Sequence, residues 1–225
     1  MDTSLQISFG MAFSSMSMQS QMLDDFLLIN QFSSFEFPWE IIFPAGQYLS
    51  ILSIPDKVRK LNKSLICGGI MEERLTCEIP FADEKMRQHF TQQLISALKK
   101  LSQVHVYIAS LECPLENIIG DETATASLQE ILRAVAPILI SENMILLLPL
   151  RMPSNIAPDV VKFLRDTMIP NIKLRLDIHP WDLHSVKNPE IMAGRLNFET
   201  KVITFRYDAD CGYKIKKTHL APVRV

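Results

Sequence analysis

Residues 144–178 read MILLLPLRMPSNIAPDVVKFLRDTMIPNIKLRLDI and contain the pattern of a strand, a helix and a second strand. The apolar run over 144–150 is typical of a strand that is covered on both faces. Pro158 suits the first turn of a helix that extends through Met168, and residues 171–178 predict the next strand. Two strands joined through a helix pair in parallel by a right-handed crossover. This segment therefore predicts a βαβ unit.

The same alternation continues over the rest of the chain. About seven strand–helix units in one chain favour an α/β fold, a (β/α)8 TIM-type barrel forming a single domain over 1–225, rather than an open doubly wound sheet. No G-x-G-x-x-G follows the first strand and no Walker A motif occurs, which also disfavours a nucleotide-binding fold. Too little chain follows Asp208 for a full last unit, so either residues 218–225 supply an eighth strand directly, or the last unit is incomplete or irregular, with closure by a hairpin as a further alternative. The other predicted strands cover 5–13, 32–37, 64–70, 104–112 and 201–208, and the other predicted helices cover 18–30, 47–62, 83–102, 125–141 and 188–195.

Composition and charge limit the classes of partner. The chain has 225 residues, of which 48% are hydrophobic and 21% are charged, as in packed globular proteins. A net charge of −2 gives no reason to expect nucleic acid or an anionic membrane as the main partner. The first basic residue is Lys57, and no apolar run approaches the length of a membrane span, so neither a secretory signal nor a transmembrane helix is expected. Four cysteines without a C-x-x-C pair are typical of thiols in a reducing compartment, and we predict a cytoplasmic protein.

Polar residues follow the predicted strands at the end where βα-barrels build their active sites. Carboxylates and guanidinium groups gathered at one rim would bind a polyol or a sugar phosphate, and carboxylates with an imidazole suit Mg²⁺, Mn²⁺ or Zn²⁺. The alternative is that these residues merely end the strands, because loops are exposed to water. The residues concerned are Glu36, Glu112, Arg151, Asp177, His179, Arg206 and Asp208.

The sixth predicted strand carries charges on one face. In NIKLRLDIHP (171–180), Lys173, Arg175 and Asp177 alternate with aliphatic residues that would face the helices. A charged face pointing into the barrel needs compensation, because an unpaired buried charge costs several kcal/mol. We therefore expect Arg175 to pair with a carboxylate of a neighbouring strand, with Glu36 as the candidate. The network would either lie beneath an active site or be purely structural.

The strand order, LDIHP on the sixth strand and RYD on the seventh resemble the xylose isomerase-like barrel superfamily of sugar isomerases, sugar epimerases and endonuclease IV-type enzymes. In that family the sixth strand commonly ends in L-D-x-x-H with a metal-binding Asp, which Asp177 matches, whereas His179 comes one residue early. The seventh strand often reads H-x-x-D, where Asp208 matches and Phe205 replaces the His. Arg151 stands where the fifth strand of the family ends in a metal-binding Glu.

The resemblance implies a sugar isomerase- or epimerase-like enzyme that acts on a small carbohydrate or sugar phosphate, with a degenerate site for Mn, Mg or Zn, or with no metal. The alternative is a non-catalytic, metal-free barrel that binds a ligand or a partner protein. An endonuclease is disfavoured because the chain lacks a basic stripe. Whether the chain is an enzyme, and whether it forms a homo-oligomer, stay open. The predicted site residues are Glu36 and Glu112 as acid–base groups, Arg151, Trp181 and Arg206 for substrate binding, and Asp177, His179 and Asp208 for metal binding; Trp181 has packing over the barrel mouth as its alternative role.

Overall fold

In the part of the chain that the structure describes, seven parallel strands pair in the order in which they occur in the sequence. The computed structural model describes residues 10–12, 33–37, 39–43, 54–70, 83–113, 115–152, 154–178 and 200–205. The strands are β1 (Gly10–Ala12), β2 (Ser34–Phe37), β3 (Ser64–Cys67), β4 (Ile108–Ser110), β5 (Ile145–Met152), β6 (Ile172–Ile178) and β7 (Thr200–Phe205). All six pairings between successive strands are parallel.

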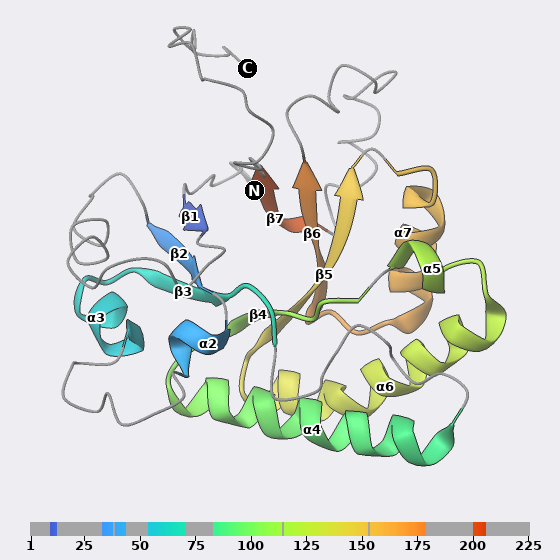
Figure 1. Cartoon of the computed structure of the whole chain (residues 1–225), viewed down its shortest axis with the longest axis horizontal. Helices are drawn as coiled ribbons and strands as arrows, with labels where there is room; N and C mark the ends of the chain where they lie inside the picture. The colour runs from blue at the N-terminus through green and yellow to red at the C-terminus, as the bar shows by residue number, and fades with distance from the viewer. Residues whose placement is uncertain are drawn as a thin grey trace, which may run out of the picture.

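Helices flank the strands on the left, below and on the right in the view of Figure 1. They are α2 (Trp39–Ile42), α3 (Ile54–Lys60), α4 (Glu84–Gln103), α5 (Leu115–Ile118), α6 (Glu122–Ser141) and α7 (Ala157–Thr167). A doubly wound sheet would reverse its strand order at a switch point. A sheet that keeps chain order through seven strands is instead the arrangement of a βα-barrel. In the part of the chain described here, β1 and β7 are the two edges of the sheet.

The long helices form where the sequence combines an apolar stripe with a capping residue. Asp83 caps α4, accepting a hydrogen bond from the backbone N of Lys85 at 2.8 Å. Asp121 caps α6 in the same way, accepting from the backbone N of Ala124 at 2.8 Å. The buried stripes of the two helices belong to one core with the outer face of the sheet, and this core includes Leu94, Leu98, Leu101, Leu128, Leu132, Val135, Leu146, Leu148, Leu150, Leu174 and Leu176.

Strand alternation divides β5 and β6 into two faces. Leu174 and Leu176 belong to the helix-facing core, whereas Arg175 lies between them in sequence and has the opposite orientation. The register sets Pro149 against Arg175, and Arg151 against Asp177. The inner face of the sheet therefore carries the charged residues of the sixth strand, as the sequence predicts.

Several predicted boundaries are wrong for local reasons. The described part of the helix expected over 47–62 is α3, which has Pro55 in its first turn, where the missing N–H costs nothing. The helix expected over 125–141 begins three residues earlier, at Glu122, because Asp121 caps it. The strand expected from residue 104 begins only at Ile108, since His105 takes a turn conformation with φ 61°.

The two four-residue helices α2 and α5 escaped prediction, because they are too short to show a periodic pattern. The helices expected at 18–30 and 188–195, and the closure of the barrel after Asp208, lie outside the described residues. Within the described residues, no helix combines the length and apolarity needed to cross a membrane.

Candidate functional site

Arg175 lies at the centre of the candidate site. It is the middle residue of β6, and its side chain is 0% exposed. Its Nε donates to Oδ1 of Asp177 at 3.0 Å and its Nη2 donates to Oδ2 at 3.1 Å. Both oxygens of the Asp177 carboxylate are thus held by one planar guanidinium. Such bidentate pairs are strong and fix the orientation of both groups.

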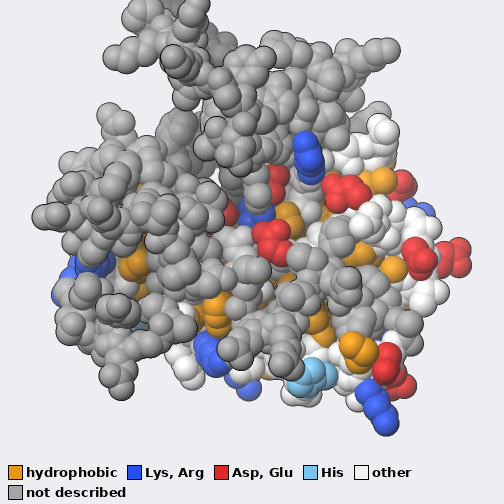
Figure 2. Space-filling view, in the orientation of Figure 1, with side chains coloured by type: hydrophobic (Ala, Val, Ile, Leu, Met, Phe, Trp, Pro, Cys, Tyr) orange, Lys and Arg blue, Asp and Glu red, His pale blue; other side chains and the backbone are white. Residues whose placement is uncertain are grey.

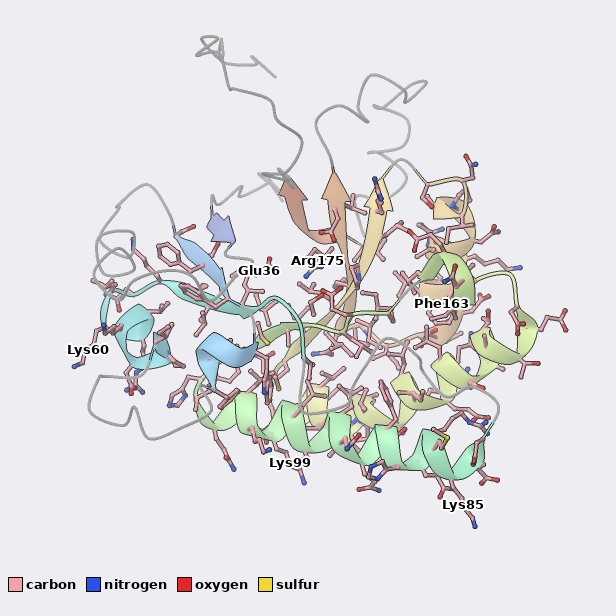
Figure 3. The ribbon with its side chains drawn as sticks, in the orientation of Figure 1. Glu36, Lys60, Lys85, Lys99, Phe163 and Arg175 are labelled. Carbon is pink, nitrogen blue, oxygen red and sulfur yellow. The ribbon has the colours of Figure 1, made fainter. Side chains whose placement is uncertain are left out.

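The other Arg175 contacts reach across the inner face to β2, to the end of β3 and to the end of β4. Nη1 donates to Oε1 of Glu36 at 3.3 Å and to the carbonyl oxygen of Gly68 at 2.7 Å, and Nη2 donates to Oε1 of Glu112 at 2.9 Å. Figure 3 shows Glu36 and Arg175 between β2 and β6, the strands that carry them. We call these five residues the Arg175 cluster. They give each of the five guanidinium N–H groups an acceptor, so Arg175 is fully satisfied.

The pairing of Arg175 with Glu36 confirms the sequence prediction in its residues but corrects its geometry. Glu36 does not come from a neighbouring strand, because β6 pairs with β5 and β7, whereas Glu36 lies on β2. The long arginine side chain spans the interior instead. The two further carboxylates, Asp177 and Glu112, and the Gly68 carbonyl are partners that the sequence did not assign to Arg175.

Two consecutive glycines make room for the two glutamates. A Cβ at Gly68 would lie 2.7 Å from Oε1 of Glu36, and a Cβ at Gly69 would lie 3.2 Å from Cγ of Glu112. The Gly-Gly pair after the third strand therefore marks a close approach, one of the two roles that its position suggests. Its signal in the sequence is visible, but the residues that approach it are not.

We expect Gly68→Ala to destabilise the fold by about 1–3 kcal/mol, because the new methyl group displaces Glu36 from Arg175. Urea unfolding measures the effect. Gly69→Ala is the matched control and should cost less, since its closest contact is longer. In a Glu36→Ala background the cost of Gly68→Ala should largely disappear, and an unchanged cost there would contradict the proposed clash.

The electrostatics keep Arg175 charged. Burial lowers the pKa of Arg175, but Glu36, Asp177 and Glu112 together outweigh it, so that the pKa lies above its ordinary value. With every group ionised the three carboxylates exceed the guanidinium by two negative charges. Acidic and basic side chains lie next to one another in the middle of the face shown in Figure 2.

The three carboxylates differ in their access to solvent. The side chain of Glu112 is 36% exposed, against 13% for Glu36 and 11% for Asp177. Proton transfer requires contact between the carboxylate and the reacting molecule. Glu112 is therefore the member of the cluster that a ligand can reach most easily.

The structure brings three of the predicted site residues together, namely Glu36, Glu112 and Asp177. Arg151 lies at the end of β5, in register with Asp177 on the adjacent strand, and its side chain is exposed. The remaining predicted residues, Trp181, His179, Arg206 and Asp208, lie outside the described residues.

Sequence reasoning overlooked Ser110. Its side chain is 0% exposed, and within the described residues its Oγ has no hydrogen-bond partner. Ser110 precedes Glu112 by two residues on an extended segment, which places both on the inner side of the sheet. In the sequence, Ser110 could have been identified by its position two residues before Glu112, a carboxylate predicted to lie at the rim.

A divalent cation does not fit the described part of this cluster. Hard cations bind carboxylate oxygens at about 2.0–2.6 Å, but both oxygens of Asp177 already accept hydrogen bonds from Arg175. A cation on these oxygens would lie beside the guanidinium and be repelled by it. Of the residues that the structure describes, no three His, Cys, Asp or Glu are grouped to hold a metal. A site formed by Asp177 with His179 and Asp208 stays a prediction.

An all-parallel sheet in chain order, with flanking helices and a polar cluster at the carboxyl ends of its strands, defines a TIM-type α/β barrel. Comparison with solved structures defines the fold more closely: the chain has the fold of the xylose isomerase-like TIM barrels. It matches no protein-family model, and a search of curated proteins finds no significant match.

Three solved structures illustrate the similarity. A D-psicose 3-epimerase crystallised with D-fructose matches with a TM-score of 0.60 at 12% identity, over 89% of this chain and 85% of that chain. A 3-keto-D-glucoside 4-epimerase from E. coli gives 0.58 at 11% identity, over 88% and 78%. An AP endonuclease of family 2 from Brucella melitensis gives 0.53 at 12%, over 88% and 92%. At these identities the similarity shows the fold.

Proposed function

We propose that this protein is a sugar isomerase- or epimerase-like enzyme that acts on a small carbohydrate, with Glu112 as its acid–base group. The observation that carries the proposal is the Glu112 carboxylate, which is exposed on one side and held on the other by a buried guanidinium. It lies just after β4, at the strand ends where TIM-type barrels build their active sites. The similarity to two sugar epimerases supports this choice of chemistry.

The chemistry requires a base and a cationic group. Glu112 would remove a proton from the carbon next to a sugar carbonyl, and the electrons of that C–H bond would move onto the carbonyl oxygen to form an enediolate. Arg151, exposed at the end of β5, would stabilise that oxygen. Protonation of the same carbon from the opposite face, by solvent or a second acid, gives an epimer. Protonation of the neighbouring carbon by Glu112, with transfer of the hydroxyl proton there to the former carbonyl oxygen, gives an isomer.

The cluster also favours a ligand rich in hydroxyl groups. Ionised carboxylates only accept hydrogen bonds, so the exposed edge of Glu112 suits sugar hydroxyls as donors. The chain's net charge of −2 favours a small carbohydrate over nucleic acid. Cys67 and Cys113 are buried and form no disulfide among the described residues, which suits the reducing cytoplasm that we propose as the location.

Proton exchange with solvent tests the function without knowledge of the true substrate. The purified protein is incubated in D₂O with a panel of ketoses and aldoses, and deuterium at the carbon next to the carbonyl is followed by NMR. We expect protein-dependent exchange for at least one sugar. Loss of exchange in Arg151→Met with an unchanged unfolding midpoint would support the role of Arg151, whereas no exchange across the panel would reject an isomerase or epimerase.

A non-catalytic, metal-free barrel is the second candidate. It is favoured by the fact that all five N–H groups of Arg175 already have acceptors within the protein. Asp177 and Glu36 are nearly buried, and each is held by the guanidinium, as in a structural ion network. Sugar binding without exchange, measured by calorimetry on the same panel, would favour this function over the first.

A further inference from the structure

We propose that the guanidinium of Arg175 takes the place of a divalent cation at the centre of the barrel, so that the Glu36, Glu112 and Asp177 carboxylates are held together without a metal. The inference concerns the cluster itself and does not depend on which ligand the rim binds. It departs from the divalent site that the family resemblance implies.

The contacts carry the first step of this argument. Three carboxylates from β2, the end of β4 and β6 converge on one cationic group, with nitrogen–oxygen distances of 2.9–3.3 Å. Carboxylates that meet without a cation cannot all stay ionised, because like charges repel. Arg175 supplies the positive charge that lets them meet.

The geometry of the guanidinium carries the second step. Asp177 offers both of its oxygens to Arg175, and Glu36 and Glu112 each offer Oε1. A divalent ion would need these same oxygens while lying beside a fixed positive charge. Arg151, in register with Asp177, adds a second positive group at this edge of the sheet. The position that a metal needs is therefore unfavourable for one.

The consequence is that Arg175 is a positioning residue. It is fully buried and has no N–H group left for a ligand, so it cannot contact the reacting atoms. It instead fixes Oε1 of Glu112 and leaves the other side of that carboxylate toward solvent. The chain carries its cation in the side chain rather than acquiring it from solution.

Titration with Mn²⁺ tests the inference on the full-length protein. Electron paramagnetic resonance should detect no stoichiometric Mn²⁺ binding to the wild type at about 1 mM, the weak end of protein sites for divalent cations. Arg175→Gln removes the guanidinium that neutralises the three carboxylates and should gain a site. We expect about 1 mM Mn²⁺ to raise the Tm of this variant by about 5 °C. The exposed Arg133→Gln on α6 is the control and should not respond.

Two results would overturn the inference. The first is one Mn²⁺ bound per wild-type chain and lost in Asp177→Asn, which would show that the carboxylates serve a metal. The second is a folded Arg175→Gln variant that gains no affinity for Mn²⁺. If Arg175→Gln fails to fold, the wild-type titration, with Asp177→Asn beside it, decides the question alone.

Discussion

Arg175→Met is expected to lower the free energy of unfolding by about 3–5 kcal/mol, or to prevent folding altogether. The methionine keeps the apolar bulk of the side chain but removes five hydrogen bonds and the positive charge. Glu36 and Asp177 are nearly buried and would lose the guanidinium that neutralises them. Either they bind protons or the strands that carry them separate. Urea unfolding followed by circular dichroism at neutral pH measures the loss.

The control for this change is Arg133→Met. Arg133 lies on α6 with its side chain exposed, so the same substitution there should shift the stability by no more than about 0.5 kcal/mol. Equal midpoints for the two variants would mean that Arg175 does not point into the barrel. Partial recovery in Arg175→Lys would show how much of the effect depends on charge and how much on the five-donor geometry.

Glu112→Gln is expected to reduce solvent exchange of the sugar proton by about 10²–10⁴-fold, the usual contribution of a positioned acid–base group. The amide oxygen can still accept from Nη2 of Arg175, so the contact observed at 2.9 Å has a neutral substitute. The fold should therefore persist while the ability to take a proton is lost. NMR in D₂O measures the exchange, and urea unfolding checks the fold.

Glu116→Gln provides the matched comparison, because Glu116 is an exposed acid on the short helix α5. That variant should keep the wild-type exchange rate. If Glu112→Gln also keeps it, another group removes the proton. Glu36 is then the next residue to replace, although its lower exposure makes it the weaker candidate.

The order of the strands and the longer helices was predictable, because each of these elements carries its own hydrophobic pattern. The pairing of Arg175 with Glu36 was also predictable, since a charge on the inner face of an apolar strand requires a partner. The role of Glu112 as a further partner was not, because the tilt of the strands decides which side chains meet across a barrel. Val104 and Val106 resembled the start of a strand, but the intervening His105 turns the chain. No periodic signal reports such a turn.

The contacts of Arg175 join residues that are 139, 107 and 63 positions apart in the chain. Closing such long loops costs conformational entropy before the contact stabilises the chain, so these contacts tend to form late in folding. A nascent or partly folded chain can therefore contain several complete βα units and still lack the contacts of the Arg175 cluster. The Arg175 cluster is complete only after the last long-range contacts form. The fraction of molecules that bind a ligand would therefore measure the fraction that is fully folded.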